Sequence, residues 1–260
     1  MSTAPADVAY ILSGTLPPAL QVRLGLAHPP KTVDLGANWY TAAVKHVVDY
    51  PARVARPWLG DSIRQGVHAL EAGLRATDGP VIVVALSQGT VVVDLLLARL
   101  AEDPAAPPAA QISFITISAP NRGLFSRLPK GTNLLGYRVI RPVESRYSTT
   151  VITGEYDLWS DPPDRPWNLA AALNAIAGAR YVHVQAATVA SPADVPAENV
   201  SVRTNCMGAT VTEVLVPTKK LPLLQPLRNI GVPVRFVNFI EKPLRRVVNR
   251  GYKRHDEKAP

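Results

Sequence analysis

Residues 81–101 read VIVVALSQGTVVVDLLLARLA and join two apolar segments of different period. Val81–Leu86 is apolar at every position, as expected for a central parallel strand buried on both faces. Residues 88–101 place apolar side chains at helical spacing instead. A hydroxyl and an amide, from Ser87 and Gln88, stand between the two segments. The stretch therefore predicts a strand, a sharp turn and a helix.

The same alternation of strands and helices continues on both sides of this stretch. Further strands are expected at 8–12, 111–118 and 148–154, and helices at 61–76, 166–179 and 237–247. Strand ends near 86, 118 and 154 are about thirty residues apart, the size of a strand–helix–strand unit. The pattern predicts an α/β fold with a mainly parallel sheet and helices on both faces.

The length and composition favour one large domain. The 260 residues are 47% hydrophobic and 18% charged, enough for a sizeable core, so residues 1–260 are treated as a single domain. From about residue 185 the pattern changes to short β-prone runs and spaced prolines. Residues 185–235 are therefore interpreted as a candidate cap or lid, within a C-terminal cap or helical region.

The formal net charge of +8 is concentrated near the C-terminus, and residues 253–260 are interpreted as a basic tail. A basic segment of this kind favours peripheral contact with lipid or with a partner in an assembly. No aromatic side chains alternate with these charges as they do on a base-stacking surface, so no nucleic-acid partner is expected.

The single cysteine, Cys206, allows no intrachain disulfide and no cysteine-based zinc site, and no metal or other cofactor is expected. Residues 1–15 lack the basic segment and the apolar run of a cleaved signal peptide. No window of about twenty apolar residues predicts a membrane span. Location stays open between the cell envelope, export without a cleaved signal, and a virion. The Ala-, Pro-, Arg- and Val-rich composition indicates an actinobacterial or actinophage genome.

Ser87 lies where a nucleophile elbow places its serine, between a strand and a helix. The usual pattern is G-x-S-x-G, and here Ala85 replaces the first glycine while Gly89 keeps the second. The following helix N-terminus leaves backbone N–H groups free. The alternative is that Ser87 simply caps the helix. We predict that Ser87 is a nucleophile.

A serine nucleophile needs a base and an orienting acid. His183 follows the helix at 166–179 and lies downstream of the strand ends, so it is the candidate base, with a half-buried loop histidine as the alternative. The other histidines lie in an early loop, a helical-looking run, a helix and the charged tail, at positions 28, 46, 68 and 255.

Asp157 directly follows the strand at 148–154, so its carboxylate is expected at the same sheet edge as Ser87. Asp161 is the competing acid, although Pro162 after it also suits a turn residue. The chain order Ser87, Asp157, His183 is that of α/β hydrolases. For the oxyanion hole we predict the backbone N–H of Gln88 and a donor from the loop after residues 8–12, where Thr15 adds a hydroxyl. The alternative for this loop is a tight turn without a catalytic role.

With these motifs the chain resembles the PE-PPE domain family, a mycobacterial serine α/β-hydrolase domain that is similar to cutinases. The resemblance covers most of residues 8–252. It is found in ILSGTLPP (11–18), SIRQGVHALEAGL (62–74), ISAPNRGLFSR (117–127), GEYDLWSDPPDRPWNLAAALNAIAGARYVH (154–183) and VPTKKLPLLQPLRNIGVP (216–233).

The resemblance implies an esterase or lipase that hydrolyses fatty acyl esters through an acyl-enzyme, with Ser87, Asp157 and His183 at the positions of the triad. One alternative is an acyltransferase on glycolipids such as trehalose esters. Another is a non-catalytic, hydrolase-like module of a phage or cell-envelope assembly. The chain departs from the family pattern at Ala85, at Gly89 and at Ser118-Ala119.

Overall fold

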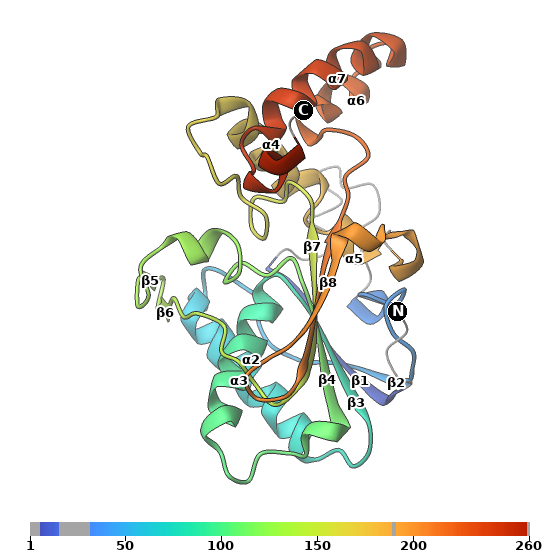
Figure 1. The fold of residues 1–260 in the computed structure, drawn as a ribbon. Coiled ribbons are helices and arrows are strands. Elements are labelled where there is room, and N and C mark those ends of the chain that lie inside the picture. Colours follow the sequence, from blue (N-terminus) through green and yellow to red (C-terminus); the bar gives the residue numbers. More distant parts are fainter. Residues whose placement is uncertain (1–5, 16–31, 189–190, 259–260) are drawn as a thin grey trace.

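The computed structural model describes residues 6–15, 32–188 and 191–258 and has a seven-stranded sheet at its centre (Figure 1). The sheet order is β2-β1-β3-β4-β7-β9-β8, and every pairing is parallel except that of β8 with β9. The strands are β1 (Ala6–Leu12), β2 (Ala42–Val47), β3 (Val81–Leu86), β4 (Ile112–Ile117), β7 (Ser148–Gly154), β8 (Val200–Thr204) and β9 (Thr210–Val216). A separate short hairpin pairs β5 (Asn133–Leu134) with β6 (Tyr137–Arg138).

Helices cover both faces of the sheet, as the apolar pattern predicts. The α-helices are α2 (Leu59–Arg75), α3 (Gln88–Glu102), α4 (Leu169–Tyr181), α5 (Gln185–Thr188), α6 (Gln225–Asn229) and α7 (Val234–Asn249). One face is buried under α2 and α3. The other face is buried under α5 and the segment around Trp39. The prediction of an α/β-hydrolase type of architecture is confirmed.

The strand at 42–47 was not expected. The helical-looking run that contains His46 is β2, and its register with β1 pairs Val8 with Val44. The helical interpretation of this run was wrong. An edge strand has one side in solvent, so Lys45 and His46 can interrupt its β-branched residues without entering the core.

Part of the region from 185 to 235 belongs to the sheet, and part belongs to a separate group of helices. Residues 200–216 form β8 and β9 and extend the sheet, so they are not part of a cap. Beyond the carboxyl ends of the strands, α4, η6 (Pro222–Leu224), α6, α7 and η7 (Lys253–Lys258) form a helical layer with its own small core (Figure 1). Whether any of it moves as a lid stays a prediction.

The first part of the expected basic tail is folded against the helical layer. Residues 253–258 form η7, and Arg254 lies over the ring of Tyr252 at 4.2 Å from its centroid. Residues 259–260 lie outside the described residues. Within the described ranges, no helix combines the length and the apolar character needed to cross a bilayer.

Candidate active site

Ser87 is held in a strained backbone conformation between β3 and α3. Its φ of 53° and ψ of −114° are unfavourable for a residue with a side chain, and such residues cluster at functional sites. Its backbone N–H donates to the carbonyl of Ile117 at 2.9 Å. On the neighbouring strand, Ser118 has a φ of 55° and donates its N–H to Ile152 at 2.8 Å. Two adjacent strands are therefore each followed by a serine with a positive φ at one rim.

Two glycines allow the elbow to pack against the end of β1. A Cβ added at Gly89 would lie 2.8 Å from the Leu12 Cβ, so this position has no room for a side chain. A Cβ added at Gly14 would lie 3.6 Å from the Ser87 Oγ. The loop after β1 therefore lies against the serine. Thr15 follows Gly14 directly, and its role as a second donor stays a prediction.

Gln88 is anchored by its own buried side chain, which is 3% exposed. Its Nε2 donates to the carbonyl of Arg53 at 2.9 Å, and its Oε1 accepts from the Ser62 hydroxyl at 3.2 Å. The backbone N–H of Gln88 is the first of α3, where no preceding helical carbonyl is available. Its role as an oxyanion donor stays a prediction.

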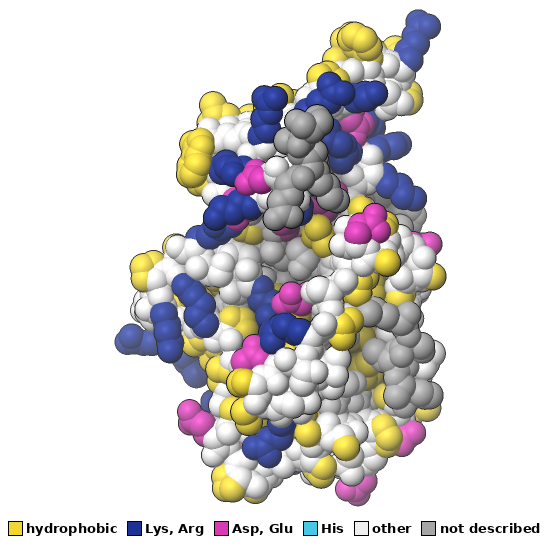
Figure 2. Space-filling view, in the orientation of Figure 1, with side chains coloured by type: hydrophobic (Ala, Val, Ile, Leu, Met, Phe, Trp, Pro, Cys, Tyr) yellow, Lys and Arg dark blue, Asp and Glu magenta, His cyan; other side chains and the backbone are white. Residues whose placement is uncertain are grey.

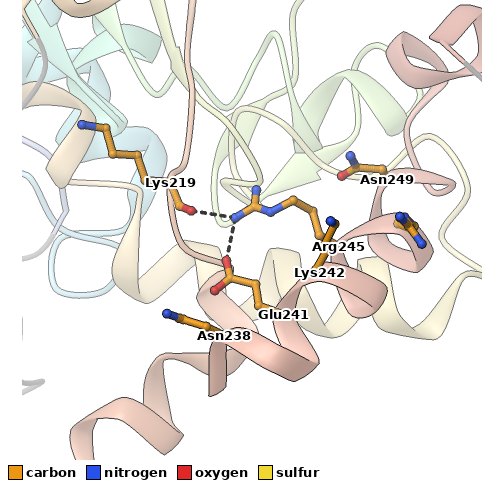
Figure 3. Close-up of a pocket in the computed structure, with 7 residues that line it drawn as sticks. Lys219, Asn238, Glu241, Lys242, Arg245 and Asn249 are labelled. Atoms are coloured by element: carbon orange, nitrogen blue, oxygen red, sulfur yellow. Dashed lines mark hydrogen bonds and ion pairs between the residues drawn. The ribbon is translucent and has the colours of Figure 1, made fainter. Parts of the chain in front are cut away.

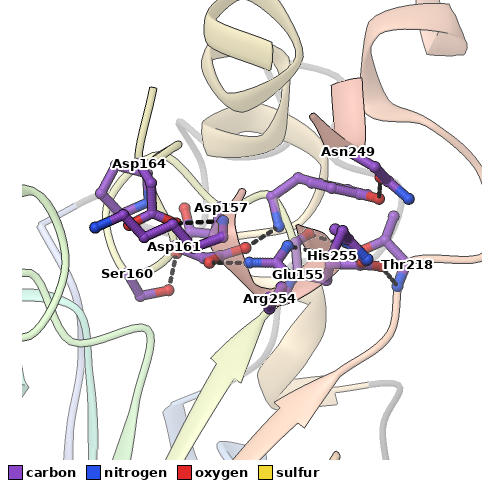
Figure 4. A network of polar contacts seen from close by, with 12 residues as sticks. Glu155, Asp157, Ser160, Asp161, Asp164, Thr218, Asn249, Arg254 and His255 are labelled. Carbon is purple, nitrogen blue, oxygen red and sulfur yellow. Dashed lines mark hydrogen bonds and ion pairs between the residues drawn. The ribbon is translucent and has the colours of Figure 1, made fainter. Parts of the chain in front are cut away.

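Asp157 and His183 are paired in the interior. The His183 Nδ1 and the Asp157 Oδ2 are 2.8 Å apart, and the two residues are 6% and 0% exposed. The same Oδ2 accepts from the Ser160 hydroxyl at 2.6 Å (Figure 4), while Oδ1 accepts from the Trp159 N–H at 3.2 Å. These bonds fix the carboxylate and, through it, the orientation of the imidazole.

The backbone of His183 is positioned by α4 and by β4. Its N–H donates to the carbonyl of Gly178 at 3.2 Å, and its carbonyl accepts from the Ser118 hydroxyl at 2.8 Å. A Cβ at Gly178 would lie 1.9 Å from the carbonyl oxygen of Tyr156, so glycine is required for α4 to approach the Asp157 loop. Sequence analysis did not identify Ser118 or Gly178 as positioning residues, although Ser118 was noted as a departure from the family pattern.

Asp161, the competing acid, is bonded to groups other than the imidazole. Its Oδ2 accepts from the Tyr156 N–H at 2.7 Å, and its Oδ1 accepts from the Arg254 guanidinium at 2.7 Å (Figure 4). Burial raises the pKa of Asp161 to about 7, although the charge of Arg254 opposes this shift. In this structure the carboxylate that contacts His183 is therefore that of Asp157.

The remaining histidines lie elsewhere. His46 stacks on Tyr10, His68 is exposed on α2, and His255 lies in η7 near Glu155. His28 falls outside the described residues. In the part of the chain that is described, no three His, Cys, Asp or Glu side chains are grouped as metal ligands.

The structure places Asp157 in hydrogen-bond contact with His183, and it packs Gly14 against Ser87. Among the described residues, the Ser87 hydroxyl makes no hydrogen bond, so no hydrogen bond connects these two pairs.

The fold and this rim define a protein of the α/β-hydrolase type. The chain matches the model of the PE-PPE domain over residues 41–253, and it belongs to the PE-PPE domain family.

Three relatives from Mycobacterium tuberculosis have been given functional names. SL1278 acyltransferase Chp1 is 40% identical over 261 residues, which cover 96% of this chain and 65% of Chp1. Diacyltrehalose acyltransferase Chp2 is 32% identical over 278 residues, covering 96% of this chain and 76% of Chp2. Esterase PE16 is 33% identical over 223 residues, covering 76% of this chain and 40% of PE16. The chain thus spans less than two thirds of Chp1 and of PE16.

Among solved structures, a cutinase-like protein from Cryptococcus sp. is similar, with 17% identity and a TM-score of 0.30. The similarity covers 45% of this chain and 54% of that protein.

Proposed function

We propose that this chain is an acyl-transfer enzyme that acts on carboxylic esters, with Ser87 as nucleophile, His183 as general base and Asp157 as the group that orients His183. The observation that carries the proposal is the buried hydrogen bond of 2.8 Å between Asp157 and His183. A neutral imidazole held through Nδ1 presents Nε2 as a proton acceptor, which is what a serine nucleophile requires.

In the proposed reaction, the Ser87 Oγ attacks the ester carbonyl while His183 Nε2 takes the hydroxyl proton. The negative charge that develops on the carbonyl oxygen is stabilised by the Gln88 N–H and by a donor at Thr15. The imidazolium then protonates the leaving alcohol as the carbon–oxygen bond breaks, which leaves an acyl group on Ser87. A second hydroxyl compound, deprotonated by His183, attacks the acyl-enzyme and restores the free serine.

The acceptor in the second step decides between two activities. Water as acceptor makes the chain a fatty acyl esterase or lipase, and this is the reaction we propose first, supported by the similarity to esterase PE16. An alcohol as acceptor makes it an acyltransferase. The similarity to Chp1 and Chp2, which extends over 96% of this chain in each case, supports a glycolipid acceptor as the second candidate.

The first test uses a fluorophosphonate probe and a short p-nitrophenyl ester. The wild-type chain should be labelled on Ser87 and should hydrolyse the ester, whereas Ser87→Ala should lose labelling and at least about a thousandfold in kcat. Ser201→Ala, which changes an exposed serine on β8, is the matched control and should behave as wild type. Folded wild-type protein that is neither labelled nor active would instead support a non-catalytic module.

The second test separates the acceptors. An acyl ester is incubated with the enzyme in water, with and without trehalose or glycerol, and the acylated products are quantified. Free fatty acid as the main product under both conditions supports the esterase. Acylated trehalose or glycerol that depends on Ser87 supports the acyltransferase.

A further inference from the structure

The helix α7 has a second apolar side that faces solvent. Val237 and Val248 bury one side in the core of the helical layer. The other side carries the outer strip, defined as Phe236, Phe239, Pro243 and Val247. Phe236 is 56% exposed and Phe239 is 77% exposed. At helical spacing these four positions fall within a sector of about 80°, so they form one continuous surface.

Basic side chains line one edge of the outer strip. Arg235, Lys242 and Arg246 are exposed on α7 at this edge. Beside them lies a groove of about 440 Å³ whose wall includes Lys219 and Arg245 (Figure 3). Arg245 is committed to Glu241 and to the carbonyls of Thr218 and Lys219.

Within the described residues, Lys242 and Arg246 form no ion pair, so their charges remain available to an external anion. An apolar strip beside uncompensated cations is the arrangement of a helix that lies in a membrane interface.

The net positive charge of the whole chain is carried by residues 219–258. Residues 219–258 contain eleven Lys or Arg and three Asp or Glu, a difference equal to the +8 of the full sequence. Residues 1–218 are therefore balanced. Figure 2 shows hydrophobic side chains intermixed with Lys and Arg over the helical layer. This distribution is complementary to an anionic surface.

We propose that the outer strip and its basic edge dock this protein onto an anionic lipid bilayer. Phe236 and Phe239 enter the acyl-chain boundary, while Lys242 and Arg246 contact lipid phosphates. The neighbouring helix α4 adds a second exposed apolar stripe, Leu169, Leu173 and Ile176, that begins beside Trp167. Tryptophan is enriched at membrane interfaces.

Docking also has a consequence for the proposed function. The helical layer lies beyond the carboxyl ends of the strands, which is also the end that carries Ser87 (Figure 1). A docked molecule would hold this rim near the lipid, where acyl esters are concentrated. The docking itself does not depend on the proposed chemistry.

Vesicle flotation tests the proposal with the full chain. Vesicles of phosphatidylcholine, with and without about 30% phosphatidylglycerol, are mixed with protein at about 0.1 M and 0.5 M salt. The wild type should bind the anionic vesicles, and less tightly at high salt. Lys242→Glu/Arg246→Glu should lower the partition coefficient by at least about 25-fold, about fivefold for each charge lost. Phe236→Ser/Phe239→Ser should lower it at least about tenfold on both vesicle types.

Matched variants away from α7 provide the controls. Val44→Ser/Val47→Ser removes exposed apolar side chains on β2, and Lys130→Glu/Arg138→Glu makes the same charge change near β5 and β6. Both should bind vesicles as the wild type does. Equal binding by the Phe236/Phe239 variant and the wild type, or no binding to anionic vesicles at all, would overturn the proposal.

A second copy of the chain is the competing occupant of the strip. A wild-type dimer in light scattering that becomes monomeric in Phe236→Ser/Phe239→Ser would overturn lipid docking in favour of self-association. Failure of the catalytic proposal has a different signature. Ser87→Ala should bind vesicles as the wild type does, and the Phe variant should hydrolyse a soluble ester at the wild-type rate.

Discussion

The elbow after β3 and the loop after β7 stand at the same rim of the sheet but are held in different ways. The elbow is fixed by close packing, with Gly89 against Leu12 and Gly14 against Ser87, and by the buried hydrogen bonds of the Gln88 side chain. The loop after β7 is fixed by polar groups, since Asp157 accepts from Ser160 and Asp161 pairs with Arg254 of η7. The elbow thus depends on nearby strands, whereas the loop after β7 depends also on Arg254, which follows Asp161 by 93 residues in the chain.

This difference explains how two carboxylates four residues apart take different positions. Arg254 holds Asp161 and leaves Asp157 to His183. The long-range ion pair therefore contributes to the candidate site although Arg254 itself does not contact His183.

The largest expected effect on kcat comes from replacing each of the two aspartates by asparagine in separate variants. Asp157→Asn should lower kcat on a p-nitrophenyl ester by about ten-thousand-fold, because an amide at this position favours the wrong imidazole tautomer. Asp161→Asn should change kcat by less than about tenfold. Steady-state kinetics on both variants gives the comparison.

Thermal unfolding of the two variants serves as the control for folding. Asp161→Asn should be the less stable protein, since it leaves the guanidinium of Arg254 without its main countercharge. Equal losses of kcat in both variants would contradict the assignment of Asp157 as the orienting acid.

A second and smaller effect is expected from Arg254→Met, which keeps the side-chain volume and removes the charge. It should destabilise the fold by at most about 3–5 kcal/mol at pH 8, where Asp161 of the wild type is mostly ionised, because the buried carboxylate then loses its partner. Circular dichroism during thermal or denaturant unfolding measures the loss. The double variant Asp161→Asn/Arg254→Met should recover part of it.

The loss should also depend on pH. The pKa of Asp161 is raised to about 7 in the fold, above the value of about 3.9 in an unfolded chain. Its contribution to stability is therefore fully present below about pH 4 and is lost as the pH rises through about 7. Arg254 lowers this pKa, so its removal should extend the loss above pH 7. A destabilisation that is the same at pH 5 and pH 8 would contradict this account.

The parts of the site that sequence analysis located are those held by local structure. Residues 81–86 and 148–154 were predicted as strands with the bounds that the structure gives, because their runs of β-prone residues are bounded by turn residues. The elbow at Ser87 and the position of His183 after α4 follow from the same patterns. Such features depend on period and on turn chemistry within a few residues.

The features that sequence analysis missed are held by contacts between segments far apart in the chain. Sequence analysis could not separate Asp157 from Asp161 by geometry, since the partner that separates them is Arg254, which was interpreted as part of a basic tail. The edge strand β2 was read as a helix because its pairing with β1, rather than its own pattern, decides its conformation. The contact of Ser118 with His183 likewise joins residues 65 positions apart.

The smallest expected effect concerns Ser118, which connects the two regions of the rim. Its hydroxyl donates to the His183 carbonyl, and its backbone has a positive φ, as that of Ser87 has. Ser118→Ala should lower kcat by about tenfold with KM nearly unchanged, because a buried carbonyl loses its donor and the imidazole is held less firmly. Kinetics on a soluble ester measures both constants.

A comparison of Ser118→Ala with Ser118→Gly separates the hydroxyl from the backbone. Both variants lose the donor, but glycine adopts a φ of 55° without strain and should regain about 1 kcal/mol of stability relative to alanine. If the hydroxyl positions His183, the two variants should share the same reduced kcat while differing in melting temperature. If Ser118→Gly instead restores wild-type kcat, the loss in Ser118→Ala comes from backbone strain, and the bond to the His183 carbonyl has no part in catalysis.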